Sequence, residues 1–126
     1  MTKPTAPIDF TAKVTSLTIG RNAAGTQVTT INVEGSSPAF GPFVGTVTAT
    51  GARQGGSWHY EAFALPPGGG NVTGVADGHY AAKGDAAWRT LGAGKVVTDD
   101  EGPIELRLDA EFDLAQRTWN GRLIPV

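Results

Sequence analysis

The sequence predicts an all-β protein that folds as an eight-stranded antiparallel up-and-down β-barrel, with a two-sheet β-sandwich as the alternative. Three observations favour this class. Apolar and polar residues alternate with the period of two that suits a strand, and the helical period fits almost nowhere. Eight such segments, rich in β-branched and aromatic residues, are separated by short turn-forming sequences. Short connections join antiparallel neighbours, and closure into a barrel removes exposed sheet edges, so the consecutive hairpins favour the barrel.

The first half of the chain provides four expected strands, each followed by turn-forming residues. They are 8–19 (IDFTAKVTSLTI) before RNAAG, 27–34 (QVTTINVE) before GSSPAFG, 42–52 (PFVGTVTATGA) before RQGG, and 57–65 (SWHYEAFAL) before PPGGG. The third of these carries an uncharged row, Val44, Thr46, Thr48 and Thr50, which is an uncommon exterior for a monomer. We therefore expect a homodimer or homotrimer.

The second half provides four more expected strands. They are 71–77 (NVTGVAD) before GHYAAKG, 85–97 (DAAWRTLGAGKVV) before DDEG, 103–114 (PIELRLDAEFDL) before AQ, and 117–124 (RTWNGRLI). The helix candidate is 80–88, and a turn is favoured there because Gly84 interrupts it. Asp77-Gly78 predicts a tight turn, which would place His79 and Tyr80 at a barrel rim. The acidic run at 99–101 is expected to form a solvated hairpin tip.

The stretch 104–112 (IELRLDAEF) indicates which side of a strand faces the interior. Its apolar and charged residues alternate without exception. Burying Glu105, Arg107, Asp109 and Glu111 together would cost several kcal/mol each unless they were paired, so the charged face is expected outside. The apolar face then lines the interior. Glycines within the strands are expected to allow bends or bulges during closure, or to leave room for a ligand.

The length of 126 residues predicts one domain, so we expect a single β-barrel domain over 1–126, with 1–7 as a flexible tail. A net charge of −2 and a pI near 5.6, without a basic stripe, give no reason to expect nucleic acid. Cysteine is absent, which excludes disulfides and thiolate metal sites, and two histidines do not make a metal site. No cofactor is expected, since LGAGKV at 91–96 lacks the flanking residues of a phosphate loop. No signal peptide or membrane span is visible, so we expect a cytoplasmic protein without membrane association.

The stretch 58–63 (WHYEAF) holds the most chemistry. On a strand, His59 and Glu61 share one face, and a carboxylate beside an imidazole is what an acid–base pair requires. We therefore take these two residues as catalytic candidates. Phe63 shares their face, which makes it apolar at one end and ionisable at the other, as a ligand pocket often is. The alternative is that both polar residues simply face water.

Aromatic residues are the other candidates for contacts with a ligand, since they stack on planar or apolar molecules. Arg89 could supply a cation for an anionic ligand, or pair with a carboxylate on the neighbouring strand. The alternative for the aromatics is that they fill the core. The expected ligand-binding residues are Trp58, Tyr60, Phe63, Tyr80, Trp88, Arg89, Phe112 and Trp119.

The run GVADGHYAAKGDAAWRTLG, from Gly74 to Gly92, resembles the glycine-punctuated segment of calycin-like barrels, especially allene oxide cyclase-like barrels. Gly78, Tyr80 and Gly84 carry the likeness, whereas Ala76 and Asp77 depart from it. The resemblance implies an eight-stranded barrel with a hydrophobic molecule in its lumen, which such proteins fold or cyclise. The pocket of the plant cyclases includes a cysteine that this chain lacks, so no catalytic residue is carried over.

Two functions remain open at this stage. The first is a small β-barrel that binds an apolar or planar small molecule in its lumen, as a binding protein or as a cyclase or isomerase of a secondary metabolite. Such an enzyme can work by shaping its substrate and excluding water, which needs few catalytic groups. The alternative is a non-enzymatic barrel that acts as an interaction or assembly module.

Overall fold

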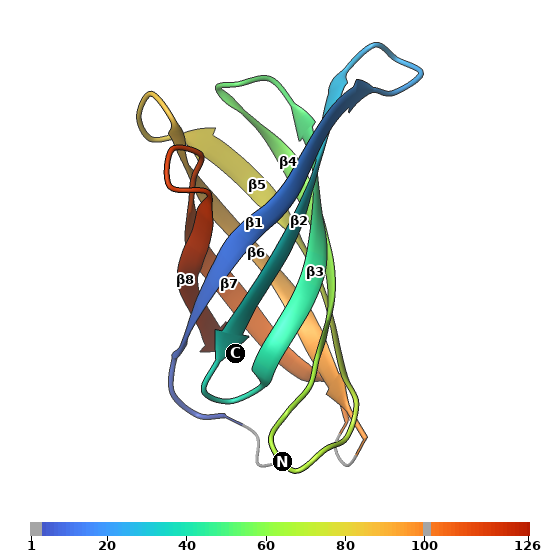
Figure 1. Ribbon diagram of the computed structural model, residues 1–126, viewed down its shortest axis with the longest axis vertical. Helices are drawn as coiled ribbons and strands as arrows, with labels where there is room; N and C mark the ends of the chain where they lie inside the picture. Colours follow the sequence, from blue (N-terminus) through green and yellow to red (C-terminus); the bar gives the residue numbers. More distant parts are fainter. Residues whose placement is uncertain (1–3, 100–101) are drawn as a thin grey trace.

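The chain forms a closed barrel of eight antiparallel strands, described for residues 4–99 and 102–126 in a computed structural model (Figure 1). Those residues contain no helix, so the predicted all-β class is confirmed. The strands are β1 (Ile8–Arg21), β2 (Gln27–Ser37), β3 (Gly41–Gly51), β4 (Gly55–Ala64), β5 (Val72–Ala82), β6 (Ala87–Thr98), β7 (Ile104–Asp113) and β8 (Thr118–Pro125).

The topology is up-and-down, because each strand pairs with its sequence neighbour and β8 closes the barrel on β1. The closing ladder runs from Ile8 opposite Leu123 to Lys13 opposite Thr118. Closure leaves no free sheet edge, which excludes the alternative two-sheet sandwich. We call the end that carries the β1–β2, β3–β4, β5–β6 and β7–β8 turns the mouth end; the β1–β2 hairpin rises furthest there (Figure 1).

The predicted turn at Asp77-Gly78 is wrong, because this dipeptide lies inside β5. The helix candidate at 80–88 does not form, as the interruption by Gly84 led us to expect: these residues are divided between β5, a short turn and β6. Gly78 pairs with Trp58 on one side and Gly92 on the other, so the strand continues through it. The predicted acidic tip lies partly outside the described residues, because positions 100 and 101 are not among them, and so does part of the predicted tail 1–7.

The inside and outside of the barrel follow the alternation of 104–112, as predicted. Ile104, Leu106, Leu108 and Ala110 are all buried, and the charged side chains between them point outward. In β1 the alternation changes phase, since the register shifts between Val14 and Ser16. An extra residue in one strand moves the following side chains to the opposite face. This bulge turns Leu17 and Ile19 toward the lumen at the mouth end, where both line a pocket.

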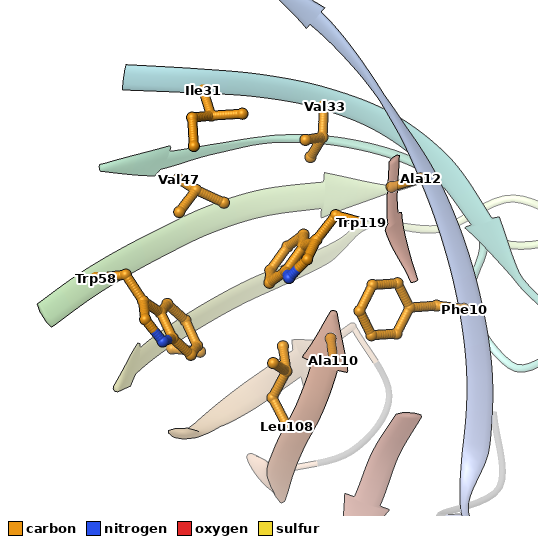
Figure 2. Packing of buried hydrophobic residues seen from close by; sticks show 10 residues of the cluster. Phe10, Ala12, Ile31, Val33, Val47, Trp58, Leu108, Ala110 and Trp119 are labelled. Carbon is orange, nitrogen blue, oxygen red and sulfur yellow. The ribbon is translucent and has the colours of Figure 1, made fainter. Parts of the chain in front are cut away.

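Trp119 lies at the centre of the core, between Trp58 and Phe10 (Figure 2). Its ring makes edge contacts with Phe10, Tyr60 and Trp58 at centroid distances of 5.3, 5.0 and 6.1 Å. Edge-to-face pairs of this kind add to the free energy of burial itself. Its indole N–H donates a 3.0 Å hydrogen bond to the Thr90 hydroxyl. The tryptophan is therefore held both by packing and by a buried polar partner.

Several glycines inside the strands lie directly beneath these rings. A Cβ added at Gly45 would meet the Tyr60 ring at 2.5 Å, and one added at Gly92 would meet the Trp58 ring at 2.5 Å. Gly78 also faces the Trp58 ring. These glycines leave room for large side chains from neighbouring strands. This role differs from the two that we expected from the sequence, a bend of the strand or space for a ligand.

Candidate functional site

The mouth end opens into an apolar pocket of about 420 Å³, here called the mouth pocket. This volume falls in the range of small-molecule sites, roughly 300–1,000 Å³. Aromatic side chains from five strands line it, namely Trp58, Tyr80, Trp88, Phe112 and Trp119. Aliphatic side chains complete the wall, namely Leu17, Ile19, Ile31, Val33, Val47, Ala49 and Leu114. The polar lining is confined to a few side chains.

The rim of the mouth pocket is fixed by hydrogen bonds to the β3–β4 turn. The Tyr80 hydroxyl donates to the Ala52 carbonyl at 2.8 Å, and the Trp88 indole N–H donates to the Arg53 carbonyl at 2.7 Å. The Arg53 guanidinium in turn donates to the Asp85 carbonyl at 2.9 Å. Two aromatic rings are thereby held in place by the adjoining β3–β4 turn. Arg53 and Asp85 are also the charged side chains among the described residues that line this pocket.

The polar groups at the floor of the mouth pocket also have hydrogen-bond partners. The Trp58 indole N–H donates to the His79 carbonyl at 3.0 Å. The Thr90 hydroxyl accepts a hydrogen bond from the Trp119 indole N–H and donates one to the Ala110 carbonyl at 2.9 Å. The described residues include no buried side-chain nitrogen or oxygen without a partner. The aromatic rings can therefore present their faces and edges while their polar atoms remain satisfied.

A second, smaller cavity lies below the aromatic cluster, toward the end that carries the chain termini. Its volume is about 90 Å³, and its lining is almost entirely apolar. Phe40, Phe43, Leu106 and Leu123 are among the side chains around it. Tyr60 also lines this inner cavity, and burial raises the pKa of its phenol above the ordinary value.

Five of the predicted ligand-binding residues meet in the mouth pocket: Trp58, Tyr80, Trp88, Phe112 and Trp119. Tyr60 faces the inner cavity instead. Phe63 and Arg89 lie outside the mouth pocket: Phe63 is 53% exposed on the outer face and borders only the inner one of the two cavities, and Arg89 is paired with Asp109 at 3.1 Å. The structure therefore separates those two from the aromatic residues of the mouth pocket. The pairing of Arg89 is the alternative that the sequence left open.

His59 and Glu61 come together as predicted, but on the outer face of β4. The imidazole Nε2 lies 3.0 Å from Glu61 Oε2, and Nδ1 lies 2.6 Å from Asp77 Oδ1 on β5. The hydrogen bond to Asp77, and then the one to Glu61, raise the pKa of His59 above its ordinary value. An acid–base role for this pair stays a prediction, and it would concern a molecule at the outer face.

Sequence reasoning missed several residues of the mouth pocket. Arg53 and Asp85 lie in turns, where the sequence carries no signal for the direction of a side chain. Thr90 is a buried threonine whose role depends on Trp119, almost thirty residues away. Leu17 and Ile19 were hidden by the bulge in β1, because strict alternation from Phe10 would place them outside.

Within residues 4–99 and 102–126, no group of three or more His, Asp or Glu side chains is placed to hold a metal ion. The same residues contain no helix with the length and apolarity needed to cross a membrane. Comparison with known proteins finds no matching family model, no similar curated protein and no similar solved structure. The resemblance to calycin-like barrels therefore extends to the closed eight-stranded architecture and no further.

Proposed function

We propose that this protein binds an apolar, planar small molecule in the mouth pocket. The observation that carries the proposal is the gathering of five aromatic side chains around one pocket of about 420 Å³ that opens at the barrel end. Burial of an aromatic ligand there would remove apolar area from water on both partners, at roughly 25 cal/mol per Å². The ligand rings would also gain edge-to-face contacts with the protein.

The hydrogen bonds of the rim support this proposal. Tyr80 and Trp88 are already held by the β3–β4 turn, so binding would not have to restrict them further. Ordering of a rotamer-rich side chain on binding costs about 0.5–1.5 kcal/mol, and a fixed ring avoids that cost. A polar end of the ligand would lie near Arg53 and Asp85 at the opening.

The test uses the solvatochromic naphthalene 6-propionyl-2-dimethylaminonaphthalene (prodan) as a planar apolar probe. We expect a blue-shifted probe emission and a raised melting temperature, because a ligand that binds only the folded state stabilises it. Trp88→Ala should weaken the affinity by about tenfold, the loss of one stacked ring. Phe63→Ala, an aromatic truncation on the outer face, is the matched control and should leave the prodan affinity unchanged. Absence of binding, or equal effects of both variants, would refute the proposal.

A second candidate is an assembly role for the outer face of β3 and β4. Val44 and Phe63 are cross-strand partners, and they are 40% and 53% exposed. Leu65 beside them is 60% exposed, and the outward row Thr46, Thr48 and Thr50 adds no charge. Large exposed apolar side chains that adjoin one another favour a contact between copies of this chain. Light scattering of wild type and Phe63→Glu tests it: a wild-type monomer would remove this candidate.

A further inference from the structure

The lumen holds two cavities, and Trp119 is the single residue of the described chain that lines both of them. The mouth pocket lies on one side of its ring and the inner cavity on the other. We infer that Trp119 is a partition that limits the depth of the mouth pocket and makes it selective for compact planar molecules over extended alkyl chains. This inference rests on the proposed function, since it specifies the class of ligand that the same pocket accepts.

The partition is fixed by its surroundings. The indole ring contacts Phe10, Tyr60 and Trp58 edge to face, as Figure 2 shows for the first and last of these. Its N–H is bonded to Thr90, which is itself bonded to the Ala110 carbonyl. The residue is only 2% exposed. A rotation that opened the floor would break these contacts and leave a buried N–H unsatisfied, which alone costs about 1–3 kcal/mol.

The two compartments differ in what they could accept. The mouth pocket is about 420 Å³ and is walled by rings, whereas the inner cavity is about 90 Å³ and is walled mainly by aliphatic and phenyl groups. A planar ligand fills the first compartment without reaching the second. Trp119, which lines both spaces, then sets the depth to which an alkyl chain entering from the mouth can be buried. Only removal of the indole would join the two spaces into one deeper channel.

The wild-type protein tests the inference through a series of n-alcohols, from 1-butanol to 1-dodecanol, that compete with prodan. Each buried methylene adds about 0.8 kcal/mol, a factor of about four in affinity. We expect the affinity to rise by this factor for the short alcohols and then to stop rising where the chain reaches Trp119. An uninterrupted rise to 1-dodecanol would overturn the inference. If prodan itself does not bind, the proposed function fails before the partition is tested.

Substitutions at Trp119 and Leu106 test whether Trp119 is the residue that stops the rise in affinity. In Trp119→Ala the break, the chain length at which the affinity stops rising, should move to chains at least about two carbons longer than in the wild type, since the space of the indole and the inner cavity both become available. Leu106→Phe fills only the inner cavity, so by itself it should leave prodan binding unchanged. In the double variant it should bring the break back toward the wild-type one. If Trp119→Ala does not fold, Trp119→Phe keeps a smaller ring and should move the break in the same direction. A folded variant with an unchanged break would contradict the inference.

Discussion

Substitution of Gly45 by alanine tests whether the strand glycines exist to accommodate lumenal rings. A Cβ at this position would lie 2.5, 2.7 and 2.8 Å from Cε1, Oη and Cζ of Tyr60, and no backbone atom is among these neighbours. The ring must therefore move within a packed interior. Overpacking of this kind costs about 1–3 kcal/mol, and the lower entropy of the unfolded alanine variant returns about 0.4–1 kcal/mol. The net expectation is a loss of about 1–2 kcal/mol.

The assay is reversible thermal or urea unfolding followed by circular dichroism. For a chain of this length the loss corresponds to a fall in melting temperature of roughly 4–10 °C. Gly20→Ala is the matched control, because a Cβ there would meet nothing within 4 Å, and its stability should be unchanged or slightly higher. In a Tyr60→Leu background the cost of Gly45→Ala should fall by about 1 kcal/mol or more, as expected for residues in contact. Equal stability of Gly45→Ala and wild type would refute the steric reasoning.

Three further outcomes are expected. His59 has a pKa raised above 6.5 in the folded state, so its contribution is fully present below that pH and is lost as the pH rises through the folded-state pKa. The side chain is 43% exposed, so the unfolding free energy should fall by less than about 1 kcal/mol between pH 6 and 8. His59→Asn should flatten this pH dependence, and an unchanged pH dependence in the variant would show that His59 is not its source. Thr90→Val should lower the unfolding free energy by about 1–3 kcal/mol because the Trp119 N–H loses its acceptor, whereas Thr90→Ser should cost much less; equal losses in urea unfolding would exclude the hydrogen bond as the cause. Arg89→Gln should leave prodan affinity unchanged, because the guanidinium pairs with Asp109 outside the barrel, and weaker binding in a titration would place it in the site after all.

The barrel itself could be predicted because its information is local. Period-two alternation, short turns and the charged face of 104–112 each indicate strands and their inner sides without any knowledge of distant residues. The length of β5 could not be predicted in this way. Asp77-Gly78 has the local chemistry of a turn, but Gly78 is needed in the strand because the backbone of Leu91 and Gly92 and the Trp58 ring all lie against it. Tertiary packing therefore overrides the local signal at this dipeptide.

The candidate site was predictable in its residue types and only partly in its geometry. The aromatic residues were expected to be lumenal, and five of them line the mouth pocket. The division of WHYEAF was also visible, since Trp58 and Tyr60 share one face of β4 and His59 and Glu61 the other. Which face is internal could not be read from this stretch, because both faces carry an aromatic residue. Closure of the barrel determines that the face with Trp58 and Tyr60 is the internal one.

The central claim, that the mouth pocket is the ligand site, is tested most directly by a crystal structure of the protein with prodan. We expect the naphthalene ring to lie inside the barrel mouth, in contact with Trp88 and Phe112 and next to Trp119. Density for the probe on the outer face beside Phe63, or a mouth pocket that the probe does not enter at saturating concentration, would contradict it.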